Sequence, residues 1–204
     1  MTRIKLLLVL TAATAVVAMA TTAGAAATGI ADHFGFGPVR SGTPVAAAHF
    51  ELSSPDLRNN QAIALAQVAN IFGCHGGNQA PRLQWSGAPA GTQSYAVTMF
   101  DPYAPTGSGF WHWLVWDIPA SDHSLSGTPP AGAVSGTNDA GLTGYLGPCP
   151  PPGDIVHRYQ LTVFALDVPS LGLPPETHAA VVGFVMRTHI LATGQLIGTY
   201  QQPG

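Results

Sequence analysis

The chain has 204 residues, which is enough for one domain with a full hydrophobic core and short for two. Only 8% of the residues are Asp, Glu, Lys or Arg, whereas Gly (24 residues) and Pro (18 residues) are abundant. This composition favours a loop-rich fold of β-strands over a helical bundle, because helix surfaces are normally rich in Lys and Glu. The scattered Arg residues predict no basic patch, so nucleic-acid binding is not expected.

The first 25 residues have the three-part pattern of a secretory signal peptide. Arg3 and Lys5 provide a basic start, and residues 6–18 form an apolar run. Ala23-Gly24-Ala25 then offers a cleavage site of small residues, and no Cys follows it to carry a lipid anchor. The alternative is an uncleaved membrane anchor, which the weakly apolar, Ala- and Thr-rich run disfavours. We therefore predict a secreted or periplasmic protein with no membrane span after cleavage.

Removal of this segment changes the charge of the protein. Of the seven Lys and Arg residues, Arg3 and Lys5 are lost, so five remain against ten Asp and Glu residues, a net charge of −5. Residues 26–44 are predicted to be a flexible leader, and residues 45–204 a single domain.

Most of this domain has the sequence pattern of strands and turns. Short strands are expected over residues 48–53, 82–85 and 195–201, and three stronger ones over residues 94–101, 111–118 and 158–166. In residues 94–101, Tyr95, Val97 and Met99 alternate with a second, largely apolar set of side chains. This strand should therefore be central and covered on both faces. Gly- and Pro-rich loops separate the three stronger strands, which favours an antiparallel sheet.

Helices are expected to be few. Residues 175–189 predict one that begins at Pro175, with Ala179, Val182, Phe184 and Met186 in a buried stripe. Residues 61–71 also have helical propensity.

The chain contains two cysteines, Cys74 and Cys149. Export would place them in an oxidising compartment, where two thiols can pair, so we predict a disulfide. The alternative is two buried free thiols.

Standard catalytic signatures are absent from the sequence: there is no G-x-S-x-G elbow, phosphate-binding loop, H-E-x-x-H or C-x-x-C. Instead, two Pro- and Gly-rich loops, in residues 101–113 and 147–159, each adjoin a strand with His among aromatic residues. Asp101, His112 and His157 are expected to converge on one small pocket. They could bind a metal ion, act as general acids and bases, or bind an anionic headgroup through imidazole N–H groups. They could also be polar residues at strand ends without a further role.

These two loops carry a family resemblance. The run Asp101-Pro102-x-Ala104-Pro105 followed by His112 resembles the D-P-D-A-P…H signature of the phosphatidylethanolamine-binding protein (PEBP) family. The loop ending in His157-Arg158-Tyr159 resembles the second signature of that family, G-x-P-x(n)-H-R-Y. Smaller matches to the bacterial, Raf-kinase-inhibitor-like branch extend over most of the mature chain. The resemblance implies a mainly β fold with a large central antiparallel sheet, a smaller second sheet and one or two peripheral helices.

The resemblance also implies a surface cavity for phosphate-like or carboxylate-like anions. Asp101, His112 and His157 would form the anion site, and its walls would come from Pro105, Phe110, Pro150, Pro151 and Tyr159. Because side chains alternate along a strand, Arg158 would face away from the cavity and serve as a structural partner. Relatives also imply a cis Ala104–Pro105 bond, and an extended or irregular course for residues 61–71 in place of a helix.

One position departs from the family pattern. Tyr103 stands where the signature has a second Asp. This change removes a negative charge at the pocket mouth, which favours anions and disfavours an amine-bearing headgroup. Tyr103 is thus a further candidate for ligand contact, while Trp111 and Trp113 are expected at the rim and in the core. A Cys74–Cys149 disulfide would pin the second pocket loop to the turn around Cys74.

The function expected from this resemblance is ligand binding without catalysis, cofactor or metal. The ligand would be a small anion or a phospholipid headgroup, and a protein such as a protease is expected as an inhibited partner. The runner-up is a metal-dependent hydrolase that uses Asp101, His112 and His157. A third hypothesis is a structural envelope protein with a vestigial pocket.

Overall fold

The computed structural model describes residues 42–44 and 47–204. The predicted signal peptide and all but the end of the predicted leader lie outside the described residues.

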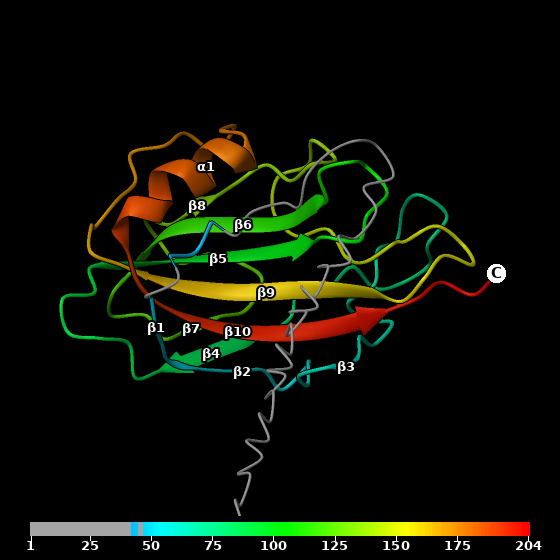
Figure 1. The fold of residues 1–204 in the computed structure, drawn as a ribbon, viewed down its shortest axis with the longest axis horizontal. Helices are drawn as coiled ribbons and strands as arrows, with labels where there is room; N and C mark the ends of the chain where they lie inside the picture. The colour runs from blue at the N-terminus through cyan, green and yellow to red at the C-terminus, as the bar shows by residue number, and fades with distance from the viewer. Residues whose placement is uncertain (1–41, 45–46) are drawn as a thin grey trace, which may run out of the picture.

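The long strands of the described chain lie side by side in one large sheet (Figure 1). They are β5 (Ser94–Asp101), β6 (Phe110–Pro119), β9 (His157–Leu166) and β10 (Ile190–Tyr200). The order is β1-β10-β9-β5-β6-β8, with the short β1 (Ala48–His49) and β8 (Val134–Ser135) at the edges, and β3 (Gln61–Ala62) also pairs with β10. The four long strands pair antiparallel, whereas β1 and β3 run parallel to β10. The predicted large central antiparallel sheet is confirmed.

A second, three-stranded sheet packs against the large sheet, and the larger hydrophobic core lies between them. It consists of β2 (Glu51–Ser53), β4 (Leu83–Ser86) and β7 (Ser124–Leu125), in the order β2-β4-β7. Apolar side chains from both sheets form one cluster, and the Tyr95 and Trp85 rings meet edge to face with centroids 5.3 Å apart. Trp113 is fully buried in this cluster, as predicted.

A short helix covers part of the other face of the large sheet. It is α1 (Ala179–Met186), followed by the 3₁₀ turn η1 (Arg187–His189). The second core cluster contains the buried residues Ala96, Leu114, Trp116, Phe164, Leu166, Ala179, Val182 and Met186. β5 therefore contributes Tyr95, Val97 and Met99 to one core and Ala96 to the other, which confirms the prediction of a strand covered on both faces. In residues 42–44 and 47–204, no helix is long and apolar enough to cross a membrane.

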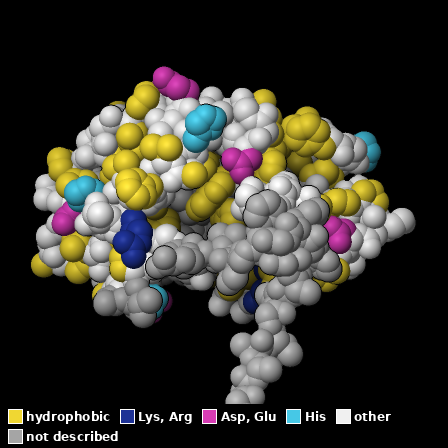
Figure 2. Space-filling view, turned by 45° about the horizontal axis from the view of Figure 1, so that its top comes forward, with side chains coloured by type: hydrophobic (Ala, Val, Ile, Leu, Met, Phe, Trp, Pro, Cys, Tyr) yellow, Lys and Arg dark blue, Asp and Glu magenta, His cyan; other side chains and the backbone are white. Residues whose placement is uncertain are grey.

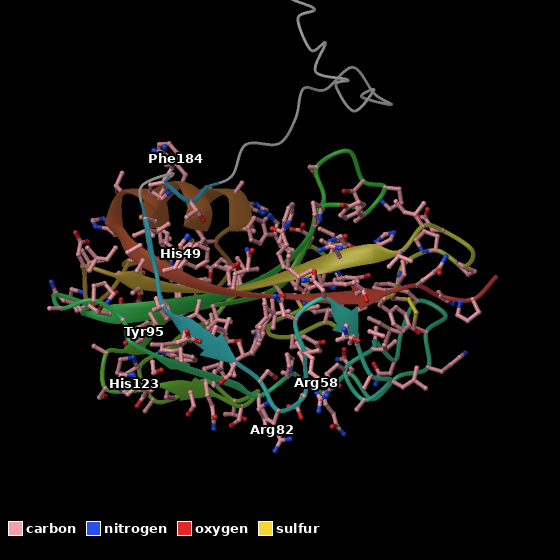
Figure 3. The ribbon with its side chains drawn as sticks, turned by 60° about the horizontal axis from the view of Figure 1, so that its bottom comes forward. His49, Arg58, Arg82, Tyr95, His123 and Phe184 are labelled. Atoms are coloured by element: carbon pink, nitrogen blue, oxygen red, sulfur yellow. A yellow bond between two sulfur atoms is a disulfide. The ribbon has the colours of Figure 1, made fainter. Side chains whose placement is uncertain are left out.

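The helix differs from its prediction in two respects. It begins at Ala179 and not at Pro175, because Pro175 lies in a loop where its carbonyl accepts hydrogen bonds from Thr137. Ala179, Val182 and Met186 are buried as predicted, but the side chain of Phe184 is exposed and points away from the sheet (Figure 3). Positions 179, 182 and 186 share one helical face, and position 184 falls on the opposite face.

Residues 61–71 form no helix, as the family resemblance implied. Gln61 and Ala62 form β3, and turns follow. The backbone N–H of Ala69 donates to the carbonyl of Pro148 (3.1 Å), and the N–H of Gly76 donates to that of Ala69 (2.7 Å). Contacts with distant segments thus take up hydrogen bonds that a helix would use, and they override local propensity.

The remaining strand boundaries shift modestly. The strand predicted over residues 48–53 is divided at Phe50, where the chain passes from the large sheet to the small one. The last strand is longer than predicted and begins at Ile190. The face in Figure 2 carries few charged side chains, as the composition requires.

Candidate functional site

A cavity of about 220 Å³ opens where three neighbouring strands of the large sheet meet at one edge. β5 ends there, and its antiparallel neighbours β6 and β9 begin there (Figure 1). The cavity is lined by every residue that the family resemblance assigned to the site: Asp101, Pro105, Phe110, His112, Pro150, Pro151, His157 and Tyr159. The sequence patterns therefore located this cavity, although the assignment of these residues to ligand contact stays a prediction.

Other lining residues were not predicted. They are Phe72, Ala104, Thr106, Leu146, Gly147 and Cys149. All but Phe72 lie within or directly beside the two signature loops, so the loops themselves were a usable signal. Phe72 comes from a separate turn, has a left-handed backbone (φ 57°), and gave no signal in the sequence.

Asp101 and His157 form a buried pair inside the cavity. His157 Nδ1 lies 2.7 Å from Asp101 Oδ2, and the two side chains are 1% and 3% exposed, respectively. The other carboxylate oxygen, Oδ1, accepts a hydrogen bond from the backbone N–H of Tyr103 (2.9 Å). The carboxylate therefore fixes the orientation of the imidazole and makes Nδ1 a donor.

A second carboxylate approaches the same imidazole. His157 Nε2 lies 3.3 Å from Asp154 Oδ2, and Asp154 Oδ1 accepts from the N–H of Ile155. The hydrogen bond from Ile155 and the neighbouring His157 lower the pKa of Asp154. His157 thus has a carboxylate oxygen near each of its two ring nitrogens. No pattern in the sequence pointed to a role for Asp154.

His112 reaches the cavity because of a β-bulge. Met99 pairs with Trp113, and Phe100 with Trp111, so His112 is the extra residue between two pairs. β-bulges change the direction in which a side chain points, and they occur often beside active sites. Leu146 then holds His112 twice: its N–H donates to the His112 carbonyl (2.9 Å), and its carbonyl lies 2.9 Å from His112 Nδ1.

Burial is the main influence on the pKa of the His112 imidazole, and it disfavours the protonated ring. It lowers the pKa of this imidazole to about 4, and the carbonyl of Leu146 and the carboxylate of Asp101 oppose the shift only in part. His112 is therefore a neutral ring at neutral pH.

Stability should depend on pH through this group. The folded-state pKa lies below the unfolded value of about 6.5, so the unfolded chain binds the extra proton more readily as pH falls. We expect His112 to lower the unfolding free energy by about 3 kcal/mol between about pH 7 and about pH 4. Urea unfolding of wild type and His112→Gln at both pH values measures this loss. His75 is exposed, so His75→Gln serves as a control and should lose as much unfolding free energy between the two pH values as wild type does. If His112→Gln lost the same amount as wild type, the prediction would be contradicted.

Tyr159 places an unpaired hydroxyl at the cavity. The residue is fully buried, and its hydroxyl makes no hydrogen bond of ordinary geometry with the described residues, although the Asp101 carboxylate lies near enough to act on its pKa. Burial, with the nearby Asp101 carboxylate, raises the pKa of Tyr159, so the hydroxyl stays a protonated donor. Its ring meets His112 edge to face, with centroids 5.2 Å apart. Buried polar groups normally have partners, so an unpaired one beside a cavity points to a ligand or ordered water.

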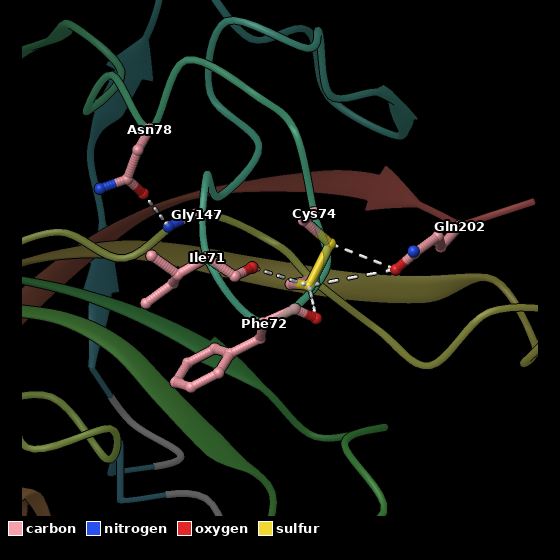
Figure 4. Close-up of a disulfide and its surroundings, with 7 residues drawn as sticks. Ile71, Phe72, Cys74, Asn78, Gly147 and Gln202 are labelled. Atoms are coloured by element: carbon pink, nitrogen blue, oxygen red, sulfur yellow. Dashed lines mark hydrogen bonds between the residues drawn. A yellow bond between two sulfur atoms is a disulfide. The ribbon is translucent and has the colours of Figure 1, made fainter.

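The second signature loop is fastened to the turn around Cys74. Cys74 and Cys149 form the predicted disulfide (Figure 4). Near it, Gly147 N–H donates to Asn78 Oδ1 (2.8 Å), and the Tyr145 hydroxyl donates to the carbonyl of Gln67 (2.7 Å). Together with the hydrogen bond from the Ala69 N–H to the Pro148 carbonyl, these contacts hold one wall of the cavity in place.

The remaining predictions about the loops have mixed outcomes. Arg158 donates to Asn60 Oδ1 (2.6 Å) and does not line the cavity, so its structural role is confirmed. The Ala104–Pro105 bond is trans, and the expected cis bond was wrong. A tight turn closes around Pro105 through Thr106 N–H and the Ala104 carbonyl (2.8 Å), which the ordinarily preferred trans bond allows.

Tyr103 lies beside the cavity and not in its wall. Its side chain is 43% exposed, and its ring centroid is 6.4 Å from that of His157. Trp111 is partly buried and packs against the core cluster under α1, so it does not line the cavity rim.

The charge of the cavity wall is modest. Among the residues that line it, none is Lys or Arg. Within residues 42–44 and 47–204, no group of three or more His, Cys, Asp or Glu side chains is arranged to hold a metal ion.

Comparison with known proteins identifies the fold and its relatives. A family model described as phosphatidylethanolamine-binding protein matches residues 53–201. The UPF0098 proteins YbcL and YbhB of Escherichia coli (strain K12) are 42% and 40% identical to this chain. These matches cover 76% and 74% of this chain, and 89% and 99% of the respective relatives.

A solved structure is also similar. The crystal structure of Escherichia coli YbcL, described as a new member of the mammalian PEBP family, is 41% identical with a TM-score of 0.73. The match covers 76% of this chain and 99% of that one. LppC of Mycobacterium tuberculosis (strain ATCC 25618 / H37Rv), named as a candidate lipoprotein, is 35% identical over 78% of this chain and 76% of its own length.

Proposed function

The chain belongs to the phosphatidylethanolamine-binding protein family, and from this premise we propose that it is an exported binding protein for a small anion or a phospholipid headgroup. The ligand would occupy the cavity at the meeting edge of β5, β6 and β9.

The observation that carries this proposal is the unpaired hydroxyl of Tyr159. An unpaired buried donor costs about 1–3 kcal/mol, and a ligand oxygen that accepts its hydrogen bond would remove that cost. His157, held by Asp101 on one side, supplies a second polar group in the same wall. An oxygen-rich ligand fits both.

The size and rigidity of the cavity support a small ligand. Pockets for drug-sized molecules usually exceed about 300 Å³, whereas this one has about 220 Å³. Pro105, Pro150 and Pro151 line it, and Pro residues restrict the backbone. Little conformational entropy would be lost on binding to walls of this kind.

We propose binding without catalysis. Two lining residues carry an aliphatic hydroxyl or a cysteine sulfur, Thr106 and Cys149. The Thr106 hydroxyl donates to the carbonyl of Gly109 (2.5 Å), and Cys149 is held in the disulfide. Because the Thr106 hydroxyl and the Cys149 sulfur are both engaged, the cavity favours capture of a ligand over attack on it by either group.

Export is supported by the signal-peptide pattern and by the disulfide, which suits an oxidising compartment. The similarity to LppC agrees with this location. A protein partner such as a protease remains part of the proposal. The exposed apolar side chains of Phe72 and Tyr103 beside the cavity would offer contact area to it.

Titration with phosphate and with phosphoethanolamine, followed through the His side-chain NMR signals, tests the proposal. We expect saturable shifts of His112 and His157. Tyr159→Phe should weaken binding about tenfold, because a donor to the ligand is lost, without lowering the unfolding free energy.

His157→Ala should abolish the shifts of His112, whereas the exposed His75→Gln should leave them unchanged. No shift in the wild type at millimolar ligand would refute anion binding in this cavity.

A further inference from the structure

The helix α1 is apolar on both of its faces. Its residues, Ala179–Met186, are all Ala, Val, Gly, Phe or Met, and none carries a polar side chain. The inner face, with Val182, packs on the large sheet. The outer face is open to solvent, where Phe184 and Val181 are 79% and 47% exposed. A helix that is hydrophobic all round is normally buried, so the open outer face of α1 indicates a partner.

The outer face combines one large side chain with a gap beside it. Phe184 points away from the sheet (Figure 3), and Ala180 lies one helical turn before it on the same face. Gly183 adjoins both residues, and a methyl group added at Gly183 would meet no atom of another segment within 4 Å. An aromatic ring from another molecule therefore has room beside Gly183 and Ala180.

Opposite charges flank this face. Glu176 lies three residues before α1, and Arg187 directly follows it. Both residues are exposed, and neither forms an ion pair with any other residue that the structure describes. A helix of eight residues is about 12 Å long, so the two charges stand at its opposite ends. The outer face is therefore complementary to a copy of itself that is turned end over end.

From these features we propose that the outer face of α1 is the contact between two copies of this chain related by a two-fold axis. In such a pair, residue i of one copy contacts residue j of the other, and the reverse contact also forms. With the two helices antiparallel, Phe184 of each copy fills the gap beside Gly183 and Ala180 of the other copy. Glu176 of each copy then lies opposite Arg187 of the other copy.

This pairing leaves the cavity open in both copies. The helix shares its core cluster with Ala96 of β5 and Leu166 of β9. These residues lie near the strand ends opposite to those that carry Asp101 and His157. Pairing and ligand binding should therefore be independent of each other.

The association should be weak. Specific interfaces usually bury about 1,200–2,000 Å² in total, and two short helices bury less, so we expect a dissociation constant on the order of 100 µM. Exposed ion pairs add little affinity, but they select one orientation of the two copies. Phe184 therefore supplies most of the affinity, and the flanking charges supply the antiparallel arrangement.

Sedimentation equilibrium of the full-length mature protein, over about 5 to about 500 µM, measures this association. Phe184→Ser should weaken it at least about tenfold, because the aromatic anchor is lost. Leu65 is also exposed but lies outside α1, so Leu65→Ser should leave the association unchanged. Circular dichroism of both variants checks that the fold is retained.

Charge reversal tests the antiparallel arrangement. Glu176→Arg and Arg187→Glu each place like charges opposite one another at both ends of the pair. Each variant alone should therefore associate at least about threefold more weakly than wild type. An equimolar mixture of the two variants sets opposite charges together at both ends, and it should regain the wild-type affinity.

A wild type that stays monomeric over the whole concentration range would overturn the inference and assign this face to a different partner. An association that neither Phe184→Ser nor the charge reversals change would also overturn it, because the contact would then lie elsewhere. Ligand titration of the same samples reports on the cavity separately, so a failure of this inference leaves the proposed function standing.

Discussion

Asp101→Ala should lower the unfolding free energy by about 3 to 5 kcal/mol, the usual effect of removing one partner of a buried pair. The substitution leaves His157, which is 1% exposed, without the carboxylate that accepts from its Nδ1. It also removes the acceptor for the N–H of Tyr103. Chemical unfolding in urea at neutral pH measures the loss, and ligand titration of the same variant should find binding abolished.

A matched control exists at the far end of β9. His189 Nδ1 and Asp167 Oδ1 form a similar pair (2.8 Å), but the side chains are 34% and 47% exposed. Water solvates both partners there, so Asp167→Ala should cost less than about 1 kcal/mol and leave binding unchanged. If both substitutions had the same small effect, burial would not be what makes the Asp101–His157 pair important.

Removal of the disulfide should have a comparable effect on stability but a small one on binding. Cys74 and Cys149 are 75 positions apart, and a cross-link of that span stabilises by about 4 kcal/mol through the entropy of the unfolded chain. We expect this loss in a Cys74→Ser, Cys149→Ser double variant, measured by thermal or urea unfolding without reductant.

Binding should persist in the double variant. Hydrogen bonds from Gly147 to Asn78, from Tyr145 to Gln67 and from Ala69 to Pro148 hold the same two segments together (Figure 4 shows the first). Phosphate affinity should therefore change by less than about threefold, under 1 kcal/mol. A loss of tenfold or more would mean that the disulfide itself shapes the cavity wall.

Much of the fold could be predicted from the sequence because strand patterning is local. The alternation of Tyr95, Val97 and Met99 with a second, largely apolar set of side chains follows directly from the two-residue period of a strand. The cavity was located for a different reason. Asp101, His112 and His157 lie in two long motifs, and the motifs place three strand ends at one edge.

Features that depend on tertiary contacts were missed. Phe72 reaches the cavity only because the disulfide and its neighbouring hydrogen bonds bring a distant turn to β9. The bulge at His112 depends on the register between β5 and β6, which alternation alone does not reveal. Phe184 is apolar but exposed, because α1 buries only the face of Ala179, Val182 and Met186, and position 184 falls on the opposite face.

The central claim is that the cavity binds a small anion through Tyr159 and the two His residues. A crystal structure of the protein with saturating phosphoethanolamine tests this most directly. The account predicts the phosphate group in the cavity, with one oxygen within hydrogen-bond distance of the Tyr159 hydroxyl and another beside His112 Nε2. A cavity that holds only water at saturating ligand, or a phosphate bound elsewhere on the surface, would contradict it.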